Sequence, residues 1–149
     1  MSIKYWLVKS EPEDYSIEDL EKDGRAGWSG VRNYQARNYM RDEMKLGDGV
    51  LFYHSNAEPP AIVGVAEVSR ESHADPAQFD SKSDYFDPKH SSSHPRWFSV
   101  RIQFVSELKT PITLQYLKEH PAFAPKALIA RSRLSVMPVT SEQWGKNIL

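Results

Sequence analysis

The sequence predicts an α+β fold, a small antiparallel barrel with short helices packed on its rim. Apolar segments of strand length recur along the 149 residues, with polar turns between them. Two of these segments, at 50–54 and 61–68, are joined by a turn alone, which indicates a hairpin rather than a βαβ unit. Capping residues precede short helical patterns between the strands. The length fits one domain, and we expect residues 1–149 to form it.

The N-terminal part of the chain begins with a strand and a short acidic helix. Apolar residues alternate along 3–8, which predicts a buried strand. Ser16 and Asp19 have the spacing of a capping box, and we expect the helix that they begin to end near Gly24. A second helix is expected over 33–46, where apolar residues follow helical spacing until a glycine stops it.

A long polar segment opens the second half of the chain. Residues 69–95 are rich in Asp, Ser, Pro and His, with Tyr85 and Phe86 as isolated apolar points, and we expect a long loop with a function. Residues 97–105 alternate with period two, which predicts a half-exposed antiparallel strand. The remaining elements expected are a helix over 114–117 capped by Thr113, a turn or short helix over 124–130, a strand over 134–139 and a terminal helix through Trp144, capped by Thr140 and Gln143.

Composition excludes several classes of protein. The chain has no cysteine, which removes disulfide scaffolds, thiolate zinc sites and cysteine nucleophiles. The histidines lack metal-ligand spacing and no phosphate-binding glycine loop occurs, so we expect neither a metal nor a cofactor. The sequence contains no apolar run of membrane-spanning length and no apolar signal core at its N-terminus. We therefore expect no membrane partner and an intracellular, cytoplasmic location, or a nuclear one if the source is eukaryotic.

Charge is unevenly distributed along the chain, although the net charge is only -1. That total argues against a polybasic protein. Residues 11–23 hold seven acids, whereas residues 24–41 hold four arginines and no acid. A second acid-free stretch, 121–141, contains Lys126, Arg131 and Arg133. If the two acid-free stretches come together in space, they form one basic face.

A basic face of this kind fits recognition of nucleic acid. Guanidinium groups bind phosphate oxygens in a bidentate manner, and exposed rings stack on bases. We expect backbone contacts from Arg25, Arg32, Arg37, Arg131 and Arg133. A second interpretation stays open, in which the arginines decorate a solvated helix and Trp28 belongs to the core.

His54 and Ser55 do not have the pattern of a hydrolase. Adjacent residues on a strand point to opposite faces, so His54 cannot activate Ser55. No Gly-x-Ser-x-Gly motif occurs either. We assign no catalytic residue to this pair.

Several motifs resemble a known family. They are Tyr5-Trp6-Leu7-Val8-Lys9-Ser10-Glu11-Pro12, Trp28-Ser29-Gly30-Val31-Arg32-Asn33-Tyr34-Gln35-Ala36-Arg37-Asn38, Gly47-Asp48-x-x-Leu51-Phe52-Tyr53-His54-Ser55, Gly64-Val65-Ala66, Trp97-Phe98-x-Val100 and Arg133-Leu134-Ser135. In this order they resemble EVE-domain proteins of the thymocyte nuclear protein type, over almost the whole chain. The resemblance implies a PUA-like pseudo-barrel, related to the YTH and ASCH domains. It also implies a reader of modified nucleobases, such as 5-methylcytosine, in DNA or RNA.

The resemblance further implies an aromatic-walled pocket that accepts a base turned out of its strand. Carried onto this sequence, the pocket region contains Lys9, Ser10, Trp28, Asn33, Phe52, Tyr53, His54 and Ser55, and its later wall contains Arg131, Ser132, Arg133, Leu134 and Ser135. Strand alternation places Phe52 and His54 on one face, and Tyr53 and Ser55 on the other. Only one of these pairs can line the pocket unless the end of the strand twists.

Two alternative functions remain open. The related ASCH fold supports amide hydrolysis by Lys, a hydroxyl residue and Glu, which suggests a hydrolase of acylated nucleosides that uses Lys9, Ser10 and either Glu11 or Glu67. A protein–protein adaptor would use its rings and the 69–95 segment as contact surface. For the reader we expect a monomer and a separate effector protein as partner.

Overall fold

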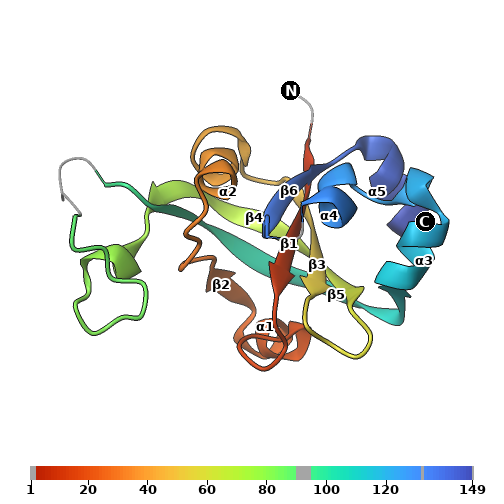
Figure 1. The fold of residues 1–149 in the computed structure, drawn as a ribbon, viewed down its shortest axis with the longest axis horizontal. Helices are drawn as coiled ribbons and strands as arrows, with labels where there is room; N and C mark the ends of the chain where they lie inside the picture. The colour runs from red at the N-terminus through yellow and green to blue at the C-terminus, as the bar shows by residue number, and fades with distance from the viewer. Residues whose placement is uncertain (1–2, 90–94, 132, 149) are drawn as a thin grey trace.

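The structure is a computed structural model that describes residues 3–89, 95–131 and 133–148 (Figure 1). Its centre is a six-stranded sheet with the order β2-β5-β4-β3-β1-β6. The strands are β1 (Tyr5–Ser10), β2 (Arg25–Gly27), β3 (Gly49–His54), β4 (Ala61–Ala74), β5 (Phe98–Thr113) and β6 (Val136–Val139). The helical elements are α1 (Ile17–Asp23), α2 (Tyr34–Asn38), η1 (Tyr39–Glu43), η2 (Pro76–Phe79), α3 (Leu114–Glu119), η3 (Pro121–Phe123), α4 (Lys126–Ala130) and α5 (Ser141–Ile148). The predicted α+β class is confirmed.

The sheet is mixed because β1 and β3 run parallel. Their register extends from Tyr5 opposite Gly49 to Ser10 opposite His54, while the other strand pairs are antiparallel. Parallel neighbours need a crossover of a dozen or more residues. Residues 11–48 supply it, with α1, β2, α2 and η1 along the way. The crossover also brings residues 26–33 beside the end of β1, where the candidate site lies.

The central strands supply most of the core. Trp6, Leu7 and Val8 of β1 are buried, as are the residues of β3 up to Tyr53. The carboxylate of Asp48, itself buried, accepts hydrogen bonds from Trp6 Nε1 at 2.9 Å and from the backbone N–H groups of Lys4 and Lys45. A buried carboxylate with three donors is satisfied, and this one ties the turn before β3 to β1.

Two strands are longer than the sequence predicts. β4 continues to Ala74, so the expected loop over 69–95 is wrong at its start, and β5 continues to Thr113 rather than ending near residue 105. Arg70 pairs with Arg101, and Ala74 with Phe98, across the extension. Much of the added strand faces solvent and carries polar residues, so its apolar pattern is weak. The three-residue β2 was not predicted either.

The capping predictions are confirmed at three helix starts. Ser16 and Asp19 form the capping box of α1, Thr113 Oγ1 accepts from Tyr116 N, and Thr140 and Gln143 bond reciprocally before α5. The helix expected over 33–46 is instead two elements, α2 followed by the π-helix η1.

The two ends of the sheet carry different structures (Figure 1). The helices α3, α4 and α5 gather at one end, and residues 75–89 of the segment between β4 and β5, with η2, lie at the other. Among the described helices, none has the length and apolar character that a membrane span requires.

Candidate functional site

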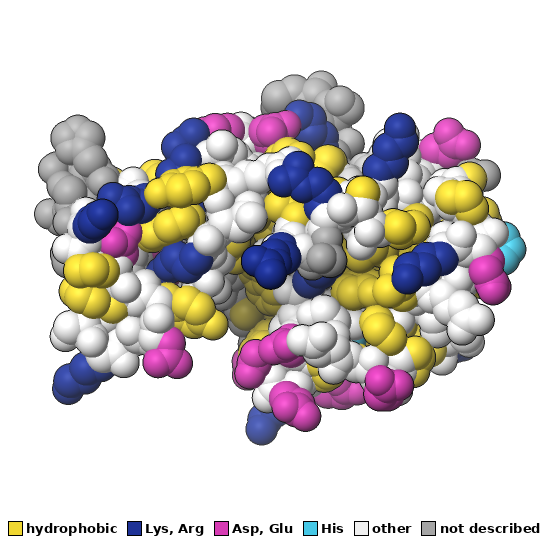
Figure 2. Space-filling view, viewed as in Figure 1, with side chains coloured by type: hydrophobic (Ala, Val, Ile, Leu, Met, Phe, Trp, Pro, Cys, Tyr) yellow, Lys and Arg dark blue, Asp and Glu magenta, His cyan; other side chains and the backbone are white. Residues whose placement is uncertain are grey.

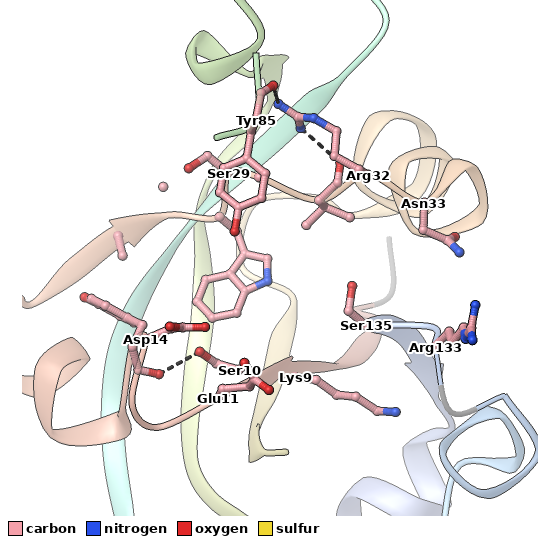
Figure 3. A pocket seen from close by; sticks show the side chains of 16 residues that line it. Lys9, Ser10, Glu11, Asp14, Ser29, Arg32, Asn33, Tyr85, Arg133 and Ser135 are labelled. Carbon is pink, nitrogen blue, oxygen red and sulfur yellow. Dashed lines mark hydrogen bonds between the residues drawn. The ribbon is translucent and has the colours of Figure 1, made fainter. Parts of the chain in front are cut away.

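A cavity of about 620 Å³ lies beside the end of β1 (Figure 3). Four parts of the chain line it: residues 9–15 around the end of β1, residues 26–33 after α1, Tyr85 from the segment between β4 and β5, and Arg133 with Ser135 before β6. Small-molecule pockets typically measure about 300–1,000 Å³. The cavity is therefore large enough for one nucleobase.

Seven of the residues proposed from the sequence line this cavity. They are Lys9, Ser10, Trp28, Arg32, Asn33, Arg133 and Ser135. Phe52, Tyr53, His54, Ser55 and Leu134 do not line it, nor do Arg25, Arg37 and Arg131. Ser132 lies outside the described residues.

Trp28 forms one wall of the cavity with most of its indole covered. Its backbone N–H donates to Val100 O at 2.7 Å, which fixes the residue just beyond β2. The indole packs edge-on against Phe52 and Tyr15, with ring centroids 5.5 Å and 6.4 Å away. Phe52 therefore supports Trp28 from behind instead of facing the cavity.

The end of β3 anchors α1. Phe52 and Tyr53 are buried, and the half-buried His54 accepts a hydrogen bond at Nε2 from Ile17 N, 3.1 Å away. Burial lowers the pKa of His54, which keeps the ring neutral and able to accept. Ser55 N donates to Ser10 O at 3.0 Å. Phe52, Tyr53 and His54 are thus used in packing and anchoring, and Ser55 is held through its backbone.

The cavity has a cationic side and an acidic side. Figure 3 shows Lys9 and Arg133 beside Ser135, with Asp14 across the opening. Lys9 is half-buried, and burial lowers the pKa of its ammonium group. On the acidic side, a hydrogen bond with Glu11 raises the pKa of the exposed Asp14. A ligand with both donor and acceptor groups suits walls of opposite charge.

Arg32 is bound to protein atoms on three sides. Its guanidinium donates to Asp75 Oδ2 at 2.9 Å, to Tyr85 O at 2.6 Å and to Val31 O at 3.1 Å. Asp75 is fully buried and also accepts from the backbone N–H groups of Gly30 and Ala77. Asp75 and the position of Tyr85 at the cavity could not be predicted from the sequence, because these contacts join segments more than 40 residues apart along the chain.

The other arginines differ in their exposure and in their hydrogen bonds to the protein. Arg37 donates to Arg96 O and Asn38 Oδ1, and burial with the nearby Arg41 lowers its pKa. Arg25, Arg131 and Arg133 are exposed. Figure 2 shows a band of Lys and Arg side chains across the middle of the face that carries the cavity, with a group of Asp and Glu below it. Charge is thus segregated on the surface of the folded molecule.

The residues of the hydrolase alternative are only partly brought together. Lys9, Ser10 and Glu11 line the cavity, whereas Glu67 is exposed on β4 and outside the lining. Ser10 Oγ donates to Tyr15 O at 2.6 Å, and Glu11 accepts from the Asn56 amide. The Ser10 hydroxyl is therefore directed at a backbone carbonyl instead of a base. Within the described residues, no group of three or more His, Asp or Glu has a geometry that holds a metal ion.

Comparisons with known proteins give close relatives of this chain. An uncharacterized protein of Schizosaccharomyces pombe is 40% identical over 156 residues, which cover 95% of this chain and 65% of that protein. Thymocyte nuclear protein 1 of Mus musculus is 42% identical over 160 residues, which cover 94% of this chain and 70% of the mouse protein. This chain thus spans about two thirds of the length of these relatives.

Solved structures also include close relatives of this chain. Human THYN1 protein, in a crystal structure with 5-methylcytosine-containing DNA, matches with a TM-score of 0.91 at 37% identity, over 97% of this chain and 95% of that chain. An ASCH protein from Zymomonas mobilis is only 13% identical, with a TM-score of 0.52, and shares the fold alone.

The family model described as EVE domain matches residues 4–148 of this chain. The resemblance found in the sequence motifs is confirmed by this match and by the thymocyte nuclear protein relatives. The chain belongs to the EVE domain family.

Proposed function

We propose that this chain is a reader of modified nucleobases, which accepts one base turned out of its strand into the cavity beside Trp28. The observation that carries the proposal is this cavity, which combines an indole wall with the cations Lys9 and Arg133. The complex of human THYN1 with 5-methylcytosine-containing DNA supports the choice of ligand. 5-Methylcytosine in DNA is therefore the modified base that we propose.

The chemistry of the cavity suits a base that has left its stack. Flipping a base out of the duplex costs a few kcal/mol in lost stacking and pairing, and contacts with the protein have to offset this cost. Trp28 and Tyr85 offer aromatic surface, while Lys9, Ser10 and Asn33 offer polar groups for the base edge. A methyl mark adds one apolar contact, so we expect a preference of about 10-fold to 200-fold at most for the methylated base.

The exposed cations around the cavity suit the sugar–phosphate backbone. Arg133 lies at the opening, and Arg131 is exposed two residues before it. Arg25 is exposed on β2, which leads directly to Trp28. We propose these three arginines as phosphate contacts and Arg32 as part of the pocket wall.

A binding titration tests the proposed function. Fluorescence anisotropy would compare a short duplex that carries one 5-methylcytosine with the same duplex unmodified. We expect tighter binding of the methylated duplex, and loss of the preference in Trp28→Ala. Because Trp28 is largely buried, Lys9→Met serves as a second pocket variant that removes the charge and keeps the length of the side chain. Equal affinity of the wild-type protein for both duplexes would overturn the proposal.

We propose that binding occurs without turnover. Two observations favour the alternative, an ASCH-like hydrolase. The fold is similar to that of an ASCH protein, and Lys9, Ser10 and Glu11 line one cavity. Incubation with an N-acylated cytidine, followed by chromatography, distinguishes the two functions. Hydrolysis that disappears in both Lys9→Ala and Ser10→Ala would establish the enzyme instead of the reader.

A further inference from the structure

We propose that Tyr85 is the main stacking residue for the bound base, and that Arg32, Asp75 and Gly30 hold its ring at the cavity. This inference rests on the proposed function, because it assigns a role in binding the same base. It makes the segment between β4 and β5 the second wall of the pocket. The pocket is then an assembly of β1, residues 26–33 and this distant segment.

The exposure of the two rings favours Tyr85 over Trp28 as the stacking surface. Trp28 is only 9% exposed, and Phe52 and Tyr15 cover much of its indole. Tyr85 lines the same cavity with 49% of its surface exposed. A base gains stacking energy only against ring area that water can reach before binding, so Tyr85 has more to offer.

A set of short contacts fixes Tyr85 in this position. Arg32 Nη2 donates to Tyr85 O at 2.6 Å, and the guanidinium carbon lies 5.5 Å from the centre of the Tyr85 ring. The same guanidinium forms an ion pair with the fully buried Asp75 at 2.9 Å. Figure 3 shows the Tyr85 ring beside Arg32 and Ser29, directed toward the inside of the pocket. Arg32 thus acts on the base through Tyr85, as a positioning residue.

Gly30 provides room for the ring. Its φ of +81° is in the left-handed region, and a Cβ at this position would lie 2.8 Å from Tyr85 Cε2. Its backbone N–H donates to Asp75 Oδ2 at 2.8 Å. The carboxylate of Asp75 therefore joins Gly30 and Arg32, which both lie against Tyr85.

The segment that carries Tyr85 is anchored to the sheet by buried side chains. Gln78, fully buried, donates to Trp97 O at 2.7 Å and accepts from Trp97 N at 3.0 Å. Trp97 Nε1 donates to Asp87 Oδ2 at 3.0 Å, two residues after Tyr85. Such a satisfied buried network gives the wall a defined position before any ligand binds.

Titration of Tyr85 variants against the methylated and unmodified duplexes tests the inference. We expect Tyr85→Ala to bind the methylated duplex about tenfold more weakly, and Tyr85→Phe to bind like the wild type, because stacking needs the ring and not the hydroxyl. Tyr116→Ala is the matched control, since Tyr116 is a comparably exposed ring on α3 outside the cavity lining. We expect no change in that variant.

The role of Arg32 is tested by a double-mutant cycle. If Arg32 positions Tyr85, Arg32→Gln weakens binding in the wild-type background and has little further effect in Tyr85→Ala. The salt dependence of binding then stays unchanged. If Arg32 contacts phosphate instead, the losses of binding free energy from Arg32→Gln and Tyr85→Ala add. The negative slope of log K against log salt then becomes less steep by about 0.9.

The outcomes separate this inference from the proposed function. Wild-type selectivity for the methylated duplex with unchanged affinity in Tyr85→Ala would overturn the inference alone. Equal binding of both duplexes by the wild-type protein would overturn the proposed function and this inference together. Additive losses with a reduced salt slope would overturn the positioning role of Arg32.

Discussion

Gly30 and Gly24 both have a positive φ but differ in their surroundings. Their φ angles are +81° and +80°, so a side chain at either position strains the backbone. A Cβ at Gly30 would meet the Tyr85 ring, whereas a Cβ at Gly24 would have no neighbour within 4 Å. The two glycines therefore separate the cost of backbone strain from the cost of displacing Tyr85.

We predict that Gly30→Ala weakens binding of the methylated duplex by about as much as Tyr85→Ala, roughly tenfold. Gly24→Ala should lower the free energy of unfolding by roughly 1–3 kcal/mol through backbone strain and leave binding intact. Urea denaturation and anisotropy titration of both variants measure the two effects. Equal affinities of the two alanine variants would contradict the prediction.

At the residue scale, the sequence motifs predict several of the residues that line the cavity near β1 and Trp28. Lys9, Ser10 and Trp28 line the cavity as the sequence motifs suggested. Tyr85 and Asp75 were not assigned to the site, because only the folding of a distant segment against Gly30 and Arg32 brings them there. His54 was placed in the pocket region, yet its ring bonds to the start of α1. Alternation along a strand does not reveal which neighbour covers each face.

At the scale of elements, His54 couples β3 to α1. Its Nε2 accepts from Ile17 N, the first residue of α1, and burial lowers the pKa of His54 from 6.5. The folded protein therefore binds this proton less readily than the unfolded chain does. Well above pH 6.5 the ring is neutral in both states, and its effect on stability is constant.

We predict that the free energy of unfolding falls as the pH drops below about 6.5, and that this loss levels off once the folded form is also protonated. His54→Gln keeps an acceptor for Ile17 N and should flatten this pH dependence. His120→Gln is the control, because His120 is exposed and stacks on Tyr116. Urea denaturation from pH 5 to pH 8 gives the comparison. A slope that persists in His54→Gln would assign the effect to another group.

Element boundaries were predictable where apolar patterns or caps mark them. The hairpin of β3 and β4 and the caps of α1, α3 and α5 follow from short-range rules. The outer parts of β4 and β5 do not, because their backbone pairing continues where polar residues face water. The parallel pairing of β1 with β3 was not predicted from the sequence either, because no local pattern shows which earlier strand β3 pairs with after the long crossover.

For the whole molecule, the net charge of -1 conceals a polarised surface. The acids of residues 11–23 lie on and around α1, while Arg133 lines the cavity and the exposed Arg25 and Arg131 lie within two residues of lining residues along the chain. Figure 2 shows the resulting band of cations and the acidic group below it. Phosphate contacts are independent of base identity, whereas contacts inside the cavity are not. The two sets of contacts should therefore respond differently to salt.

We predict that log K for both duplexes falls linearly with log salt. Arg133→Ala should make this slope less steep by about 0.9 for each duplex. The ratio of the two affinities should stay the same in that variant, because the phosphate contact does not distinguish the bases. Arg41→Ala is the matched control, since the Arg41 guanidinium is paired with Asp42 at 2.8 Å and lies outside the cavity lining. Titrations at several salt concentrations measure all three proteins. If Arg133→Ala changes the affinity ratio and leaves the slope intact, Arg133 contacts the base itself. The cationic band would then bind the base in the pocket instead of the DNA phosphates.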